Sequence, residues 1–268
     1  MKQIFIIFIT LILSSNIVKG QFVIEKKEVK DTAFTIPMIN ISYARQWSTS
    51  DMADRFGSNH NIGGSFMVKT KKNWIYGFKG NFLWGADVKK NTILDDIGSR
   101  LPYYNEDGDF DGEEILVIDN DGVPTAIHLG QRGSSFFLLG GKMFNKLALN
   151  KNSGFIVYGG FGMLQHKISI KFKGNIASLT DEHKKGYDRF SLGFAVNGFA
   201  GYLFMSKNRL LNFFGGFDYT QGWTKSLRKF NYDTQETDTK LNTNILYGFR
   251  LGWIIRLNKR QSQEYYYY

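Results

Sequence analysis

The chain lacks cysteine, has only three prolines and, beyond Gln21, has no apolar run long enough to cross a bilayer as a helix. Without cysteine, disulfides, thiolate metal sites and lipoprotein processing are excluded. The scarcity of proline, beside 29 glycines and 16% aromatic residues, favours a protein of long β-strands. The net charge is +10, but the basic residues form no compact cluster, which argues against nucleic-acid binding.

The N-terminus has the pattern of an export signal. Lys2 precedes an apolar stretch at residues 4–13 that only Thr10 interrupts, and small or short residues precede Gln21. The stretch is too short for a membrane-spanning helix, so we expect cleavage before Gln21; an uncleaved anchor is the alternative. This predicts a signal peptide at residues 1–20 and a periplasmic segment at residues 21–33.

Eight stretches alternate apolar and polar side chains with a period of two residues, which a helix of 3.6 residues per turn cannot produce. The clearest stretch sets Trp74, Phe78 and Trp84 against Lys79 and Asn81. The eight predicted strands cover residues 35–47, 60–70, 74–85, 134–145, 154–172, 189–205, 209–224 and 242–257.

The connectors between these strands alternate long and short, which is the arrangement of an antiparallel up-and-down transmembrane β-barrel. The fold class is therefore all-β, with the barrel at residues 34–258, short periplasmic turns and long extracellular loops. The longest loop is residues 86–133, and both termini are expected in the periplasm. A soluble sandwich is disfavoured, because the same apolar face recurs on most strands and the opposite face carries Arg250 and Arg256.

The interior of an eight-stranded barrel is filled by side chains. Asp218 and Arg250 both face inward and lie at similar heights above the periplasmic turns. A buried arginine without a carboxylate partner is costly, so we predict that the two form an ion pair in the lumen.

The long loop contains a possible calcium site. Asp107, Asp109 and Asp111, followed by Gly112, match the first half of a D-x-D-x-D-G calcium loop. Ile118 stands where a bidentate Glu belongs, and residues 87–132 hold eleven acidic and four basic residues, so a solvated acidic loop is the alternative. No other cofactor is expected. A hairpin turn is predicted at residues 119–122.

Two further features suggest sites. Tyr265, Tyr266, Tyr267 and Tyr268 follow a charged stretch. They suit either a partner-docking tag in a periplasmic tail at residues 259–268 or an interfacial anchor. His166 with Ser169 or Ser191 suggests a hydrolytic pair, but no nucleophile motif is present, so we expect the four histidines to be scattered surface residues.

The eight-strand layout resembles small outer-membrane β-barrels of the OmpA/OmpX type. The Gly20-Gln21 junction, the Tyr-Gly-Phe-Arg-Leu-Gly-Trp strand at residues 247–253 and the aromatic tail resemble the PorT-like branch of bacteria with type IX secretion. The resemblance implies a Gram-negative outer membrane, contact with its lipid, and recognition by the insertion machinery through Gly248, Leu251 and Trp253.

Together these patterns predict a non-enzymatic barrel with a structural or partner-binding role, which we expect to be accessory to a secretion or envelope-assembly complex. The alternatives are a membrane enzyme acting on lipid or peptide, and a narrow pore or small-ligand carrier. A lumen blocked by Asp218 and Arg250 argues against the pore.

Overall fold

The computed structural model describes residues 35–89, 91–146, 152–206 and 211–257. The predicted signal peptide, the segment at residues 21–33 and the tail at residues 259–268 lie outside this part of the chain. Among the described residues, no helix has both the length and the apolar character needed to cross a membrane.

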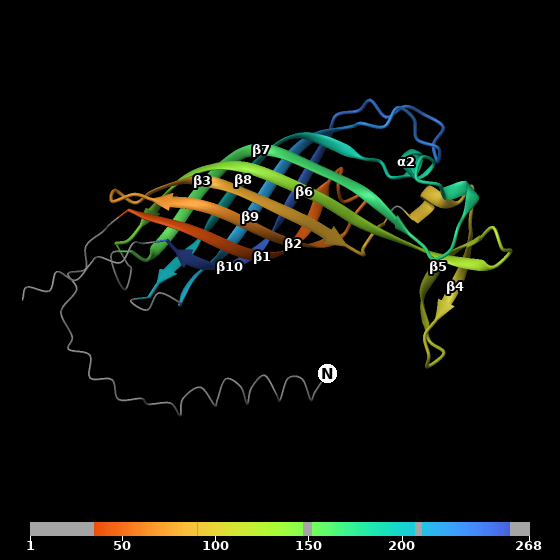
Figure 1. Ribbon diagram of the computed structural model, residues 1–268, viewed down its shortest axis with the longest axis horizontal. Coiled ribbons are helices and arrows are strands. Elements are labelled where there is room, and N and C mark those ends of the chain that lie inside the picture. The colour runs from red at the N-terminus through yellow and green to blue at the C-terminus, as the bar shows by residue number, and fades with distance from the viewer. Residues whose placement is uncertain (1–34, 90, 147–151, 207–210, 258–268) are drawn as a thin grey trace, which may run out of the picture. The chain divides into compact units, whose positions relative to one another are not determined.

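Eight antiparallel strands close into a barrel (Figure 1), which confirms the predicted fold class. The strands of the barrel are β1 (Ile36–Ser50), β2 (Ser58–Lys69), β3 (Trp74–Gly85), β6 (Pro124–Phe144), β7 (Gly154–Lys171), β8 (Ser191–Met205), β9 (Asn212–Ser226) and β10 (Asn242–Arg256). Pairing of β1 with β10 closes the barrel, and β3 pairs directly with β6. Closure leaves no unpaired edge in the barrel wall.

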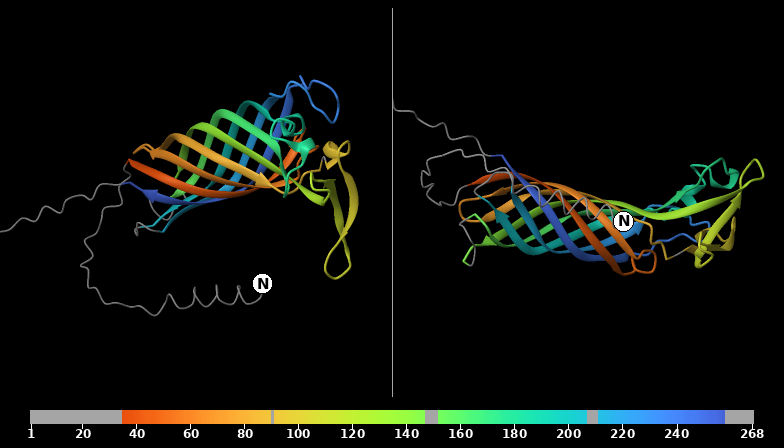
Figure 2. Two further views of the ribbon diagram at one scale, coloured as in Figure 1. Left: turned by 45° about the vertical axis from the view of Figure 1, so that its right-hand side comes forward. Right: turned by 90° about the horizontal axis from the view of Figure 1, so that it is seen from below.

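Two of the strands in the described part of the chain lie outside the barrel. β4 (Ser99–Tyr104) and β5 (Phe110–Ile118) form a hairpin, and β5 pairs with the first residues of β6. Figure 2 shows this hairpin at the loop end of the barrel, directed away from the barrel axis. Short helical turns η1 (Asn91–Leu94), η2 (Ala177–Leu179) and α2 (Lys184–Tyr187) lie in the long connectors.

The alternation read from the sequence separates the two faces of the wall. On β3, Lys79 and Leu83 point inward and are buried, whereas Phe78 and Phe82 point outward. In the turn-side half of the lumen, buried apolar side chains surround the buried Lys69 and Asn212; the apolar residues are Ile36, Met38, Met67, Ile75, Met143, Ile156, Leu203, Met205 and Ile254. The barrel therefore has a packed interior instead of an open channel.

The outer surface carries large apolar side chains on every barrel strand. Phe249 and Leu251, in the middle of β10, are 63% and 68% exposed. All five tryptophans lie near strand ends: Trp47, Trp84 and Trp223 on the loop side, and Trp74 and Trp253 on the turn side. The result is an apolar belt with aromatic residues at both rims.

The structure corrects one strand boundary. β6 begins at Pro124, ten residues before the predicted start at Ser134. The predicted turn at residues 119–122 is present, since the Asp119 N–H donates to the Val123 carbonyl (3.0 Å) and Gly122 has a φ of +79°. β6 extends this far because its first residues, Pro124 to Ile127, pair with β5, and the strand then pairs with β7 from His128 onward.

Candidate functional site

The centre of the lumen is a cluster of charged side chains around Asp218. Arg250 donates from Nη2 to Oδ2 of Asp218 at 2.9 Å, and Lys79 donates from Nζ to Oδ1 at 3.3 Å. All three side chains are at most 2% exposed. The structure thus brings together Asp218 and Arg250, the two residues that the sequence places at similar heights, and adds Lys79 as a second cation.

Neutral polar groups complete this cluster. Gln46 donates to Asp218 at 3.0 Å, and Asn197 donates to the other carboxylate oxygen at 3.2 Å. Arg250 donates to Ser42 at 2.9 Å and to Asn61 at 3.1 Å. A buried ionic group keeps its charge only when such partners replace water. Because these partners come from several strands, the cluster also joins those strands across the lumen.

Aromatic rings fill the remaining side of the lumen. Lys79 Nζ lies 5.7 Å from the ring centroids of Phe137 on β6 and Tyr158 on β7. Tyr158 stacks on Phe199 with ring centroids 4.9 Å apart, and Phe199 meets Phe214 edge-on at 5.7 Å. Every barrel strand therefore contributes to the central cluster or touches it, and the lumen is blocked at this level.

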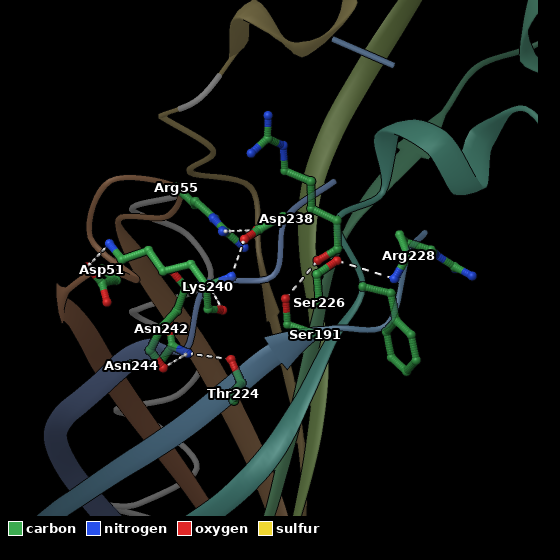
Figure 3. A network of polar contacts seen from close by, with 12 residues as sticks. Asp51, Arg55, Ser191, Thr224, Ser226, Arg228, Asp238, Lys240, Asn242 and Asn244 are labelled. Atoms are coloured by element: carbon green, nitrogen blue, oxygen red, sulfur yellow. Dashed lines mark hydrogen bonds and ion pairs between the residues drawn. The ribbon is translucent and has the colours of Figure 1, made fainter. Parts of the chain in front are cut away.

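The loop end of the barrel is covered by four connectors, which we call the loop cap: residues 51–57, 86–123, 172–190 and 227–241. Ion pairs join them across the mouth. Figure 3 shows Arg55 in contact with Asp238; the two charged groups are 3.3 Å apart. Arg228 binds Asp188 through two hydrogen bonds of 2.7 and 2.5 Å. Arg189 pairs with Asp233.

The loop cap also has an apolar core of its own. Met52, Phe56, Ile93, Leu94, Ile176, Leu179 and Tyr187 are all buried, and they come from three of the four connectors. Tyr187 donates its hydroxyl to Asp96 at 2.8 Å. Buried apolar contacts and ion pairs together hold the connectors in one arrangement, which is unlike a set of independent loops.

The charges of the loop cap shift one another's ionisation. The hydrogen bonds to the Asp188 carboxylate raise the pKa of Arg228. Burial and the hydrogen bond to Asp96 raise the pKa of the Tyr187 phenol. Burial and the nearby Arg189 lower the pKa of Arg55, while Asp238 opposes that effect. The carboxylates thus favour the charged form of the arginines that link the connectors.

The expectation that all four histidines are surface residues is wrong for His166. Its side chain is 1% exposed, because it faces the lumen and Phe56 of the loop cap packs edge-on against it at 5.9 Å. Its Nε2 lies 3.5 Å from the Thr224 hydroxyl, and the Ser191 hydroxyl donates instead to the Arg189 carbonyl. The structure therefore brings no serine hydroxyl into a hydrogen bond with His166 among the described contacts. His128 and His183 are exposed, as expected.

The residues predicted to bind calcium lie at the tip of the β4–β5 hairpin. Asn105 accepts the backbone N–H groups of Asp107 and Asp109 at 3.0 and 2.8 Å, which organises the turn. The side chain of Asp111 lies outside the described part of the structure. Within the part that is described, no three His, Asp or Glu side chains gather as a metal site would require. Calcium binding stays a prediction.

The four tyrosines at positions 265–268 also lie outside the described residues. Their role in docking a partner stays a prediction.

Comparison with known proteins finds no matching family model and no matching curated protein. Among solved structures, the attachment invasion locus protein Ail of Yersinia pestis shares 10% identity with a TM-score of 0.36, covering 83% of this chain and 99% of Ail. Neisserial surface protein A has the same identity and TM-score over 81% of this chain and 96% of its own. OprG from Pseudomonas aeruginosa shares 13% identity with a TM-score of 0.32, covering 84% and 97%. At such low values these similarities carry no argument about the function of the chain.

Proposed function

We propose that the protein is a non-enzymatic barrel of a Gram-negative outer membrane that presents its loop cap to a partner protein. One observation carries this proposal: the central cluster around Asp218 blocks the lumen, while the connectors above it are tied into one ordered surface. A blocked lumen favours neither a pore nor a carrier. What the molecule offers to its surroundings is then the outside of the loop cap.

The apolar belt supports the membrane location. In water, a continuous belt of exposed Phe, Leu, Ile and Trp side chains around the barrel would drive aggregation, whereas hydrocarbon solvates it. Aromatic side chains at both rims suit the two interfaces of a bilayer. We place the short turns, the start of β1 and the end of β10 on the periplasmic side, because long loops of such barrels face outward.

The finer assignment extends the sequence resemblance. We propose that the partner belongs to a secretion or envelope-assembly complex, which is the setting that the PorT-like pattern of residues 247–253 implies. The insertion machinery would act earlier, during assembly, on the same strand. An enzyme is the weaker proposal, because His166 is buried under the loop cap and no serine among the described residues lies at hydrogen-bond distance from it.

The membrane location and orientation can be tested with epitope tags in the full-length chain. One tag replaces residues 106–108 at the hairpin tip, and a matched tag replaces residues 71–73 in a turn at the other end. On intact cells we expect antibody binding to the first tag alone, and binding to both after the outer membrane is permeabilised. Binding to the second tag on intact cells, or recovery of the protein in the aqueous fraction, would contradict the proposal.

A further inference from the structure

The β4–β5 hairpin has an apolar face that nothing in the described part of the chain covers. Leu101, Tyr103 and Ile118 are 49%, 47% and 69% exposed. The pairing of Leu101 with Glu114 and of Ser99 with Leu116 places these three side chains on the same face of the small sheet, since side chains alternate along each strand. This outer face is therefore an unpartnered apolar surface on the loop cap.

The opposite face of the same sheet is packed. Ile115, Val117 and Ile127 are buried there. A side chain at Gly98 would come within 3.0 Å of both Ile115 and Val117, so the connector before β4 lies directly against them. The contrast between the two faces shows that the exposure of the outer face is specific to that side of the hairpin and is not the result of a loosely packed segment.

The outer face also has a position without a side chain. Gly112 lies opposite Tyr103 on β5, and the position that a Cβ would occupy on Gly112 has no atom within 4 Å. Gly112 has a φ of +134°, a conformation that favours glycine. At the tip, Tyr104 and Phe110 form an exposed edge-on aromatic pair with centroids 6.1 Å apart. Exposed aromatic rings beside open space are suited to receive the side chains of a partner.

The charge of the hairpin selects the partner. Residues 99–118 contain six acidic residues and one basic residue, Arg100, in a chain whose net charge is +10. Arg100 pairs with Asp95 and Glu113, whereas Glu106, Asp107 and Asp109 are exposed and take part in none of the ion pairs found among the described residues. Such a surface attracts a cationic partner and is repelled by anionic lipid headgroups.

The partner is expected to bind the face of the hairpin and not its edge. β4 is the outermost strand of the sheet, and Pro102 lies in its middle. Proline has no N–H to donate, and prolines in edge strands oppose pairing with an added strand. Side-chain contacts with Leu101 and Tyr103, surrounded by carboxylates, are therefore the favoured mode of binding.

Building on the proposed function, we propose that the outer face of the β4–β5 hairpin is a docking surface for a protein segment that carries basic residues interleaved with apolar ones. The apolar side chains of that segment contact Leu101, Tyr103 and Ile118 beside the open position at Gly112, and its basic side chains meet the carboxylates at the tip.

The test uses the full-length protein in phosphatidylcholine nanodiscs with EDTA present, and a short peptide of alternating lysine and phenylalanine as the probe. Matched peptides replace phenylalanine by serine or lysine by glutamate, and empty nanodiscs serve as the blank. Two variants remove the proposed contacts: Glu106→Gln/Asp107→Asn/Asp109→Asn removes charge, and Leu101→Ser/Tyr103→Ser removes apolar contact. The control variant, Asp181→Asn/Glu182→Gln, removes two exposed carboxylates from another connector.

We expect the lysine–phenylalanine peptide to bind the unmodified protein at least about tenfold more tightly than either matched peptide. Each hairpin variant should lose about tenfold in affinity, the control variant should bind normally, and high salt should weaken binding. The proposal is overturned if the hairpin variants bind the lysine–phenylalanine peptide normally, or if the serine peptide binds the unmodified protein equally well. It is also overturned if the protein binds phosphatidylglycerol vesicles and the Leu101→Ser/Tyr103→Ser variant does not, or if the hairpin mediates self-association. These results leave the tag experiment unaffected, so the two proposals fail separately.

Discussion

At the scale of single residues, Asp218 is the group on which the lumen depends most. It accepts hydrogen bonds from Arg250, Lys79, Gln46 and Asn197 and is the only carboxylate among the described contacts of that cluster. Two buried cations thus share one buried anion. Removing that anion leaves both cations without a countercharge, whereas removing one cation leaves an ion pair intact.

We therefore expect Asp218→Asn to lower the free energy of unfolding by about 3–5 kcal/mol, since it leaves buried charges unpaired. Lys79→Met should cost less, because Arg250 continues to pair with Asp218. Equilibrium urea unfolding in lipid vesicles, followed by tryptophan fluorescence, measures both. The control is Asp95→Asn, which removes an exposed partner of Arg100 and should cost no more than about 1 kcal/mol. Equal costs for Asp218→Asn and Asp95→Asn would contradict the role given to the cluster.

The sequence predicts the Asp218–Arg250 contact because side-chain alternation and distance from the turns determine the height of each residue in the barrel. It does not predict that Lys79 joins them, since β3 lies across the lumen and the reach of a side chain through the interior has no sequence pattern. The burial of His166 was missed for a related reason. Its inward position was predictable from alternation, but its cover, Phe56, comes from a connector whose folding back over the mouth had no sequence signal.

At the scale of elements, the loop cap is the unit that sequence reasoning describes least well. Its connectors are joined by Arg–Asp pairs that are distant in sequence, such as Arg228 with Asp188 and Arg55 with Asp238. Strand pairing follows from a regular period, so the predicted bounds of the barrel strands agree with the structure within a few residues, except for the start of β6. The contacts of the connectors have no period, and β4 was not predicted at all.

We expect Arg228→Gln to loosen the loop cap without opening the barrel. The variant loses both hydrogen bonds to Asp188, so the connectors 172–190 and 227–241 should separate more often and become sensitive to protease. Limited proteolysis in nanodiscs should show faster cleavage in these connectors by several-fold, with an intact barrel fragment. Lys184→Gln is the matched control, since its pair with fully exposed Asp181 holds no two connectors together. Unchanged cleavage would mean that the apolar core alone holds the loop cap.

At the scale of the whole molecule, whether the outer face of the barrel wall meets hydrocarbon or water decides how every other feature is interpreted. The lumen contains the buried charges, and the outside contains the large apolar side chains, which reverses the usual distribution of a water-soluble protein. The same outward Phe and Leu residues would be liabilities in water and are stabilising in hydrocarbon.

A single outward substitution distinguishes the two solvents by its cost. Phe249 lies in the middle of β10 and is 63% exposed. In a bilayer, Phe249→Arg places a charge near the midplane and should lower the free energy of unfolding by about 2–4 kcal/mol. In water, replacing an exposed apolar residue by arginine should change it by no more than about 0.5 kcal/mol.

The matched control is Thr234→Arg in the loop cap, which is exposed in either solvent and should be nearly neutral. Both variants are measured by urea unfolding of the full-length chain in vesicles, where partial folding is monitored separately by the tryptophan emission maximum. A neutral Phe249→Arg in a fully folded protein would mean that this face meets water. Because Leu251 and Trp253 share that face, the membrane location of the whole barrel would then have to be abandoned.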